Sequence, residues 1–396
     1  MDYKTLLTQV QRTIDSLEIP GDPRGTITRI SETIVRNFRD QLGITGGRLY
    51  ELGDEGYELV ARFGKSNKEP LGIQVPLEYR PIELVRENGI VVMDPSDPGF
   101  DPVLEKKLGA NRFAAITVGD EGHILSFNVS RESSRDDILF SLNLIRYSIN
   151  QKLRAQRYES IIAEAQRIQQ SILPQRIPPF EGYEMHARSV SAEVVSGDFY
   201  DFIPISNNVL GVAIADASGH GLPAALMARD IYVGLRMGTG RDFKIIRTLE
   251  KLNQIIHRGR LTTKFVSLFY GELESGGVLI YSNAGHNPPF IVKRNRIELL
   301  RSGGTVLGPT PDATYTRGYV RMEAGDILCL YTDGVVEARD TKGMEFGLER
   351  LERVIRANRQ KSTQEIVQAV FQRLDRWSKM VEDDRTLVAV KATASS

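Results

Sequence analysis

The stretch Leu210-Gly-Val-Ala-Ile-Ala-Asp-Ala-Ser-Gly-His-Gly221 decides the fold of the C-terminal half of this chain. It begins as an apolar run of strand length, ends in the aspartate Asp216, and passes through glycines into a helical segment that starts at Leu222. A carboxylate just beyond a buried strand is costly to desolvate, so an aspartate at this position indicates a functional site. The pattern predicts a strand, an acid at its end, and a helix immediately after it.

Aspartate recurs at the ends of three other apolar runs. The first run holds Asp198 and Asp201, three residues apart and preceded by Gly197, which permits a close approach of the backbone. The other two are Asp326-Ile-Leu-Cys-Leu-Tyr-Thr-Asp-Gly334, in which Asp333 follows the strand, and Val381-Glu-Asp-Asp-Arg-Thr-Leu-Val-Ala-Val390, in which Asp383 and Asp384 precede it. One Asp-Gly pair is typical of a turn, but four strand-end motifs indicate a shared site.

Carboxylates that meet at one end of a sheet need a cation, because buried like charges repel one another and are poorly solvated. Oxygen ligands suit hard divalent ions, and Mg²⁺ and Mn²⁺ keep several waters in near-octahedral shells. Two such ions that share a carboxylate activate a water and neutralise a phosphoryl oxygen. These residues therefore predict hydrolysis of a phosphate ester.

The order of these motifs resembles that of a known family. The chain carries, in sequence, Val195-Ser-Gly-Asp-Phe-Tyr-Asp201, Asp216-Ala-Ser-Gly-His-Gly-Leu-Pro-Ala-Ala-Leu-Met227, Asn283-Ala-Gly-His-Asn-Pro-Pro289, Tyr331-Thr-Asp-Gly-Val-Val-Glu-Ala338 and Asp383-Asp-Arg-Thr-Leu-Val388. This order is similar to that of bacterial metal-dependent Ser/Thr protein phosphatases of the sporulation, or SpoIIE, type in the PPM superfamily. The resemblance implies an αββα sandwich of two antiparallel sheets flanked by helices, with metals at one end between the sheets.

Carried over position by position, the resemblance implies a site for two Mn²⁺ or Mg²⁺ ions. Asp216 would bridge both ions, with the carbonyl of Ala217 as a further ligand, and Asp198 would hold the second ion. Asp216 also stands directly before the helices that begin at Leu222. Movement of these helices would displace the bridging ligand, so the preceding part of the chain is expected to control activity through them.

The remaining ligands come from the last two motifs. Asp333 and Asp383 would hold the first ion, and Asp384 would be a supporting or alternative ligand. The chain departs from the family at Ser196-Gly197, where Gly-Gly is usual, and we expect the serine to adjust the loop rather than the chemistry. No general acid is evident, so the metals are expected to carry most of the catalysis.

Two histidines stand within these motifs, and each has two interpretations. His220 follows Ser218-Gly219 at a helix N-terminus, where it either contacts phosphate or only shapes the turn after Asp216. His286 either protonates the leaving group or stabilises its turn through a hydrogen bond. The other histidines lack the spacing of a zinc site.

Composition excludes several classes of function. Lys plus Arg and Asp plus Glu both total 51 in 396 residues, so no overall positive field attracts nucleic acid or an anionic membrane. No apolar stretch approaches about 18 residues and the N-terminus lacks a signal-peptide core, so we expect a cytoplasmic protein. The single cysteine, Cys329, lies in an apolar run and is expected to be a buried hydrophobe.

The N-terminal half predicts an α+β domain with an antiparallel sheet. Two hairpins are expected at the turns Gly53-Asp-Glu-Gly56 and Gly119-Asp-Glu-Gly122, with a short helix between them at 81–88. The order of elements over 24–150, with the phrase Leu59-Val-Ala-Arg-Phe-Gly64, resembles a GAF sensory domain. Such a domain either senses a small-molecule or protein signal or serves as a plain structural module.

A long helix is expected next, because Ile138, Leu142, Ile145 and Ile149 follow heptad-like steps that resume at Tyr158 and end before Pro174. Its coiled-coil-like stripe either lies on its own domain or pairs with a second copy, and we favour a homodimer. The predicted domains are therefore an N-terminal helix over 1–23, a GAF-like sensory domain over 24–133, a helical dimerising linker over 134–174 and a phosphatase domain over 175–392.

The expected function is a metal-dependent protein serine/threonine phosphatase regulated by the sensory domain. The resemblance implies a phosphorylated STAS-type anti-sigma-factor antagonist as its substrate, within a partner-switching pathway of sigma-factor regulation and stress response. A pseudophosphatase that binds the partner without turnover is the main alternative. A hydrolase of small phosphate esters is less favoured, because no nucleotide-pocket motif is present.

Overall fold

The computed structural model describes residues 8, 10, 12, 23–64, 70–120, 122–130, 132–238, 244–259 and 265–393. Most of the helix expected over residues 1–23 lies outside these described residues. The chain divides into two compact units, Met1–Ser160 and Ile161–Ser396. Both units combine helices with antiparallel sheets, which confirms the α+β class.

The first unit is built on a six-stranded sheet in the order β3-β2-β1-β6-β5-β4, all of whose pairs are antiparallel. The two predicted hairpins are the pairs β1–β2 and β5–β6. The elements are α2 (Pro23–Asn37), α3 (Arg39–Leu42), β1 (Ile44–Leu52), β2 (Tyr57–Gly64), β3 (Gln74–Val75), α4 (Arg80–Asn88), β4 (Ile90–Met93), α5 (Pro102–Leu108), β5 (Phe113–Val118) and β6 (His123–Val129).

The helix α6 (Arg135–Ile172) is 38 residues long and begins in the first unit. The first residues of its predicted stripe, Ile138, Leu142, Ile145 and Ile149, are at most 1% exposed and belong to the core that α2 forms on one face of the six-stranded sheet. The first half of the stripe therefore packs on its own domain and is not available to pair with a second copy, which corrects the favoured interpretation for these residues. Further along, Tyr158 and other apolar side chains of α6 are exposed. No helix in the described ranges is both long and apolar enough to cross a bilayer.

The second unit contains two sheets. The first has the order β14-β11-β10-β9-β8 with β15 beside β11, and the second has the order β13-β12-β16-β17-β7. All pairs are antiparallel except β11–β14. Their strands are β7 (Tyr183–Val190), β8 (Asp198–Ser206), β9 (Val209–Ala217), β10 (Val266–Glu274), β11 (Val278–Ala284), β12 (Phe290–Val292), β13 (Ile297–Leu299), β14 (Gly303–Gly304), β15 (Gly318–Arg321), β16 (Ile327–Tyr331) and β17 (Arg385–Ala392).

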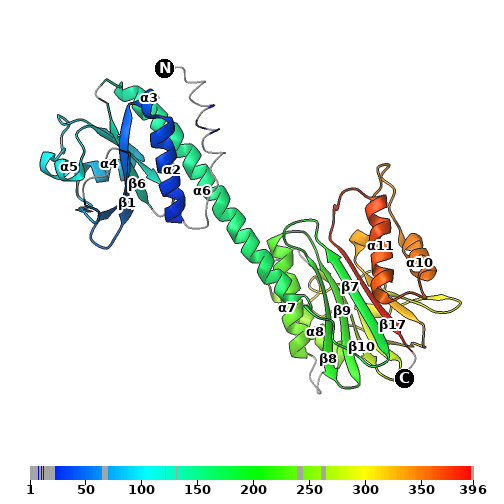
Figure 1. Cartoon of the computed structure of the whole chain (residues 1–396). Helices are drawn as coiled ribbons and strands as arrows, with labels where there is room; N and C mark the ends of the chain where they lie inside the picture. The colour runs from blue at the N-terminus through cyan, green and yellow to red at the C-terminus, as the bar shows by residue number, and fades with distance from the viewer. Residues whose placement is uncertain are drawn as a thin grey trace. The chain divides into compact units, whose positions relative to one another are not determined.

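Helices cover the outer face of each sheet in this unit (Figure 1). Figure 1 shows α7 (Leu222–Gly238) and α8 (Ile245–Arg258) beside β8, β9 and β10, and α10 (Leu348–Ala357) and α11 (Thr363–Trp377) on the side of β17. The short α9 (Asp333–Val336) follows β16. A third apolar core lies between the sheets, where Ile214 and Phe269 of one meet Leu330 and Val388 of the other. Helix, sheet, sheet and helix thus form four layers.

Candidate metal centre

The predicted carboxylates come from both sheets of the second unit. Asp198 begins β8 and lies directly opposite Asp216, near the end of β9. Asp333 begins α9 immediately after β16, and Asp383 and Asp384 immediately precede β17. Because β16 and β17 are antiparallel neighbours, the end of one adjoins the start of the other. These pairings place Asp198 beside Asp216 in one sheet and Asp333 near Asp383 and Asp384 in the other. Hydrogen bonds from Thr332 and Thr386 to Asp198 join the two groups at one end of the sandwich.

The pKa values of these acids reflect their mutual proximity. The pKa of Asp216 is raised to about 7 by burial and by the carboxylates of Asp333, Asp383 and Asp384. Burial and Asp383 raise the pKa of Asp333. Burial, followed by the charge of Asp216, holds the pKa of Asp198 well above its ordinary range. Every factor that acts on Asp216 disfavours its ionised form, which is the condition that a bound cation would relieve.

The donor set fits a hard divalent cation, since every side chain in it offers carboxylate oxygen. Within the described ranges, no three acidic, histidine or cysteine side chains converge closely enough to hold a metal ion as they stand. The two observations are compatible, because charges influence one another's pKa over distances longer than a metal–ligand bond. Holding an ion would therefore require the side chains to come closer together.

Two threonines orient Asp198, and the sequence patterns did not single out either of them. The hydroxyls of Thr332 and Thr386 donate to Asp198 Oδ2 at 2.8 and 2.6 Å, and both side chains are fully buried. These hydroxyls favour the ionised carboxylate and oppose the effect of burial on its pKa. Both bonds use Oδ2, so Oδ1 remains for another partner. The signal available in the sequence was that each threonine adjoins an acidic motif, Thr332 beside Asp333 and Thr386 two residues after Asp384.

The structure distinguishes the two neighbouring acids at the start of β17. Asp384 accepts three hydrogen bonds from the loop before β8: from Ala192 N at 2.8 Å, Ser196 Oγ at 2.7 Å and Gly197 N at 2.8 Å. Asp383 accepts only a bond from the adjacent amide of Asp384, at 2.8 Å, among the hydrogen bonds of the described residues. Asp384 thus anchors the loop that leads to Asp198, while Asp383 keeps oxygen free for a ligand.

Two glycines allow the close approaches on which this arrangement depends. A Cβ on Gly197 would lie 2.9 Å from the carbonyl oxygen of Ala217, closer than real Cβ contacts allow. A Cβ on Gly334 would overlap the carbonyl of Asp384. The Gly-Asp and Asp-Gly pairs of the sequence therefore reflect tight packing around the acids as well as turn formation.

Asp201, the second acid of the first motif, does not join the cluster. Its side chain is 1% exposed and receives hydrogen bonds from Arg236 of α7, at 3.0 Å to Oδ2 and 3.2 Å to Oδ1. Burial raises the pKa of Asp201, and Arg236 opposes that effect. This bidentate pair ties α7 to β8, and the sequence offered no spacing from which it could be inferred.

The two motif histidines occupy different settings. His220 is 85% exposed, and its Nδ1 lies 2.9 Å from Glu193 Oε1. His286 is buried, and burial lowers the pKa of its ring to about 4. Its backbone amide donates to Asn283 Oδ1 at 2.7 Å, so the main chain of this residue, rather than its ring, stabilises the turn. No hydrogen bond in the described structure joins His286 to a carboxylate.

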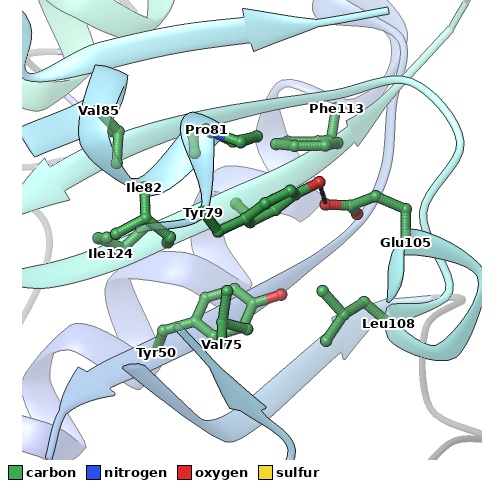
Figure 2. A pocket seen from close by; sticks show the side chains of 12 residues that line it. Tyr50, Val75, Tyr79, Pro81, Ile82, Val85, Glu105, Leu108, Phe113 and Ile124 are labelled. Atoms are coloured by element: carbon green, nitrogen blue, oxygen red, sulfur yellow. Dashed lines mark hydrogen bonds between the residues drawn. The ribbon is translucent and has the colours of Figure 1, made fainter. Parts of the chain in front are cut away.

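The first unit contains a small, mostly apolar cavity of about 20 Å³, the space of roughly one water molecule. It lies between the six-stranded sheet and the helices α4 and α5. At this place Tyr79 donates a 2.9 Å hydrogen bond to Glu105 (Figure 2). Glu105 is 2% exposed, and its Oε2 lies 3.7 Å from Nη1 of the equally buried Arg48. Burial raises the pKa of Glu105 while Arg48 opposes that effect. Glu105 thus brings a carboxylate, with Arg48 close to it, into a mostly apolar lining.

Comparison with protein families supports the resemblance read from the motifs. Residues 206–393 match the family model described as Stage II sporulation protein E (SpoIIE). Over 253 residues the chain is 31% identical to phosphoserine phosphatase RsbU of Bacillus subtilis (strain 168), covering 62% of this chain and 74% of that protein. It is also 28% identical over 314 residues to Protein IcfG of a Synechocystis species, covering 70% of this chain and 49% of that protein.

Among solved structures, the SiaA-PP2C domain of Pseudomonas aeruginosa is similar with a TM-score of 0.53 and 20% sequence identity. The match covers 60% of this chain and 98% of that domain. At this level of identity the similarity concerns the fold alone. It agrees with the two-sheet architecture that places the carboxylates.

Proposed function

The chain belongs to the SpoIIE-type family of protein serine/threonine phosphatases, and from that premise we propose that its carboxylate cluster removes phosphate from a phosphoserine or phosphothreonine with the help of two Mn²⁺ or Mg²⁺ ions. The observation that carries this proposal is the placement of Asp198, Asp216, Asp333 and Asp383 at one end of the sandwich, where burial and neighbouring carboxylates raise the pKa of Asp216 to about 7. Ionising all of these acids together without a cation is unfavourable, so the cluster suits a divalent metal.

We assign the ligands by combining the motif positions with the hydrogen bonds. Asp216 would contribute to both ions and the carbonyl of Ala217 would be a further ligand. Asp198 would hold one ion, and Asp333 and Asp383 would hold the other. Asp383 is preferred over Asp384, whose carboxylate already accepts three hydrogen bonds. When bound, such a pair of ions supplies an activated water and charge neutralisation at the phosphoryl group.

The residues of the chain would orient this site rather than transfer protons. Thr332 and Thr386 hold Asp198 through Oδ2. The bond of Asp384 to Gly197 N holds the loop that precedes Asp198. No side chain in the described structure is placed as an evident general acid, because both ring nitrogens of the buried His286 are engaged by Ser267 and Tyr331 and His220 is paired with an exposed glutamate. The leaving group would therefore take its proton from solvent.

As the substrate we propose a phosphorylated STAS-type anti-sigma-factor antagonist in a partner-switching pathway. This proposal rests on the SpoIIE-type motifs and on the similarity to a protein named phosphoserine phosphatase. A protein substrate also suits a site at the end of a sandwich, since the phosphorylated side chain can reach it from a folded surface.

Regulation by the first unit is supported by a contact at the end of α6. Gln169, which is 6% exposed, donates from Nε2 to the carbonyl of Ser196 at 3.3 Å. Ile172, one turn further, belongs to the core beneath α7. The helix that leaves the first unit thus ends on the loop that carries Asp198. A shift of α6 would reach a proposed ligand directly, and Gln169→Ala in the full chain should change the Mn²⁺ concentration needed for activity.

Two further parts of the chain support separate proposals: the cavity of the first unit for binding of a signal, and the later part of α6 for dimerisation. We propose that a signal molecule acts at the mostly apolar cavity of the first unit, where Glu105 and Tyr79 supply polar groups and Arg48 lies close to Glu105. The cavity holds about one water molecule, so a larger signal molecule would have to enlarge it. A homodimer is proposed through the exposed apolar side chains in the later part of α6, which are Tyr158, Ile161, Ile162 and Ile168.

Phosphate release from a phosphoserine antagonist protein in the presence of Mn²⁺ tests the proposed function. Wild type should turn over, Asp216→Asn and Asp333→Asn should lose activity, and Asp312→Asn, which changes an exposed acid elsewhere in the same unit, should retain it. An inert wild type that still binds the partner would favour a pseudophosphatase. Turnover of a small aryl phosphate without turnover of the phosphoprotein would favour a small-ester hydrolase.

A further inference from the structure

The segment between β11 and β12 carries the chain from one sheet of the second unit to the other. His286 lies in this crossover and is 4% exposed. Its imidazole ring contacts one strand end in each sheet: the start of β10, which lies opposite Asp216, and the end of β16, which leads to Asp333. The proposed function does not yet use this side chain.

Each ring nitrogen of His286 has a defined partner. Nε2 lies 3.1 Å from the carbonyl oxygen of Tyr331, and Nδ1 lies 2.7 Å from Ser267 Oγ. A carbonyl oxygen only accepts, so Nε2 must carry the ring proton. Nδ1 therefore accepts from the hydroxyl of Ser267. The neutral ring is satisfied at both nitrogens, which is the state that burial favours.

The partners of the ring adjoin the proposed ligands on both sides. Ser267 in β10 lies directly opposite Asp216 in β9, and its hydroxyl is 3.4 Å from the carbonyl oxygen of Asp216. Tyr331 is the last residue of β16, two positions before Asp333. The intervening residue, Thr332, donates to Asp198. The imidazole thus links the backbone beside Asp216 to the backbone beside Asp333 across the two sheets.

The rest of the motif holds this ring in place. Asn283 accepts from His286 N at 2.7 Å and donates to His286 O at 2.9 Å, which sets the backbone of the turn. Gly285 has a φ of 66°, and a Cβ there would lie within 2.7 Å of Val306 N. The turn is therefore held by Asn283 and Gly285 independently of the imidazole, so its ring serves a separate purpose.

We propose that His286 is a positioning residue that sets the spacing between the strand ends bearing Asp216 and Asp333, and thereby the affinity of the site for divalent cations. This inference rests on the proposed metal centre. Residues that orient metal ligands without touching the metal typically contribute about 10- to 100-fold to affinity or activity. The ring acts through two main-chain strands, so the effect belongs to metal binding rather than to recognition of the substrate.

The test is Mn²⁺ binding to the full chain, measured by titration calorimetry and by the Mn²⁺-induced shift in melting temperature. His286→Ala should weaken Mn²⁺ binding by about 10-fold or more. His286→Gln retains an amide donor for Tyr331 O and His286→Asn an acceptor for Ser267, so both should lie between Ala and wild type. Adding Ser267→Ala to His286→Ala should cost less than Ser267→Ala alone, because the shared bond is already lost.

Glu184→Ala is the matched control for lost stability. Glu184 accepts from the backbone amide and hydroxyl of Thr363 at 2.8 and 3.1 Å. In the β7–β17 register it lies opposite Lys391, at the end of β17 remote from Asp384. This variant should lower the melting temperature without changing Mn²⁺ affinity.

Three results would decide against the inference. Wild-type Mn²⁺ affinity in a folded His286→Ala, with binding abolished in Asp216→Asn, would overturn the role of His286 and leave the metal centre standing. Equal weakening in Glu184→Ala would overturn it too, since general loosening would then suffice. A wild type that binds no Mn²⁺ would overturn the metal centre and this inference with it. Should His286→Ala fail to fold, the Gln and Asn variants provide the comparison.

Discussion

The carboxylate of Asp384 accepts a 2.7 Å hydrogen bond from the hydroxyl of Ser196, a residue 188 positions earlier in the chain. This contact joins the last acidic motif to the loop that leads into the first one. It also accounts for the serine that stands where related phosphatases usually have glycine. The same oxygen of Asp384 accepts from Gly197 N, so one carboxylate secures both residues before Asp198.

The two neighbouring acids should respond differently to substitution. Asp384→Ala removes three hydrogen bonds, each worth about 1 kcal/mol or more, so the melting temperature should fall by roughly 5 to 15 °C. Asp383→Ala should leave the metal-free melting temperature within about 3 °C and abolish Mn²⁺-dependent turnover. Scanning calorimetry in EDTA and a phosphate-release assay separate the two effects. The reverse pattern would show that Asp384 is the ligand.

Ser196→Gly should restore the dipeptide usual in the family at a modest cost. The variant loses the bond to Asp384 and the bond that Ser196 Oγ accepts from Asp198 N at 3.0 Å, so we expect a loss of about 1 to 2 kcal/mol in unfolding free energy. Turnover should stay within roughly fivefold of wild type, because Gly197 N still holds Asp384. Urea unfolding measures the cost, and Ser196→Ala separates the hydroxyl from the added flexibility of glycine. A complete loss of activity in both variants would give the serine a chemical role.

Gly334→Ala should be severely destabilising, because the new Cβ would overlap the carbonyl of Asp384. We expect a loss of about 2 to 4 kcal/mol and little remaining phosphatase activity. Gly276→Ala is the control, since nothing lies within 4 Å of a Cβ at that position. Both variants can be compared by urea unfolding. A Gly334→Ala protein as stable as Gly276→Ala would contradict the close packing of α9 on the start of β17.

Lowering the pH should reduce the unfolding free energy of the second unit, partly through protonation of His286. The pKa of its ring is about 4 in the folded protein against 6.5 ordinarily, so between these values the unfolded chain binds the proton more readily. The stabilising contribution is complete above pH 6.5 and is lost as the pH falls toward 4. His286→Gln cannot titrate, so the stability difference between wild type and this variant should shrink by about 2 to 3 kcal/mol from pH 7 to pH 4.

Urea unfolding in EDTA at several pH values measures this difference. The carboxylates titrate in both proteins, so their contributions cancel in the comparison. A difference that stays constant with pH would mean that the folded protein accommodates the imidazolium, in conflict with the carbonyl and hydroxyl that face the ring.

The carboxylates could be found from the sequence because each sits at the end of an apolar strand, a pattern within about ten residues of chain. The linker was predicted to be helical because the apolar spacing of its stripe is likewise a local pattern. What covers that stripe could not be inferred, since Ile138 and Leu142 satisfy a heptad equally well against their own sheet or against a second helix. The choice depended on α2 and β1, which meet α6 only in the folded unit.

The sequence by itself determined the acids, their order and the elements that present them, because helix and strand periodicities and strand-end glycines are local properties. Only the tertiary structure decided that Asp384 anchors a loop while Asp383 stays available, that Thr332 and Thr386 orient Asp198, and that His286 links the two sheets. The Thr332–Asp198 bond spans 134 positions of the chain. No periodicity encodes a contact at that separation; it arises when the two sheets pack and buried polar groups must find partners.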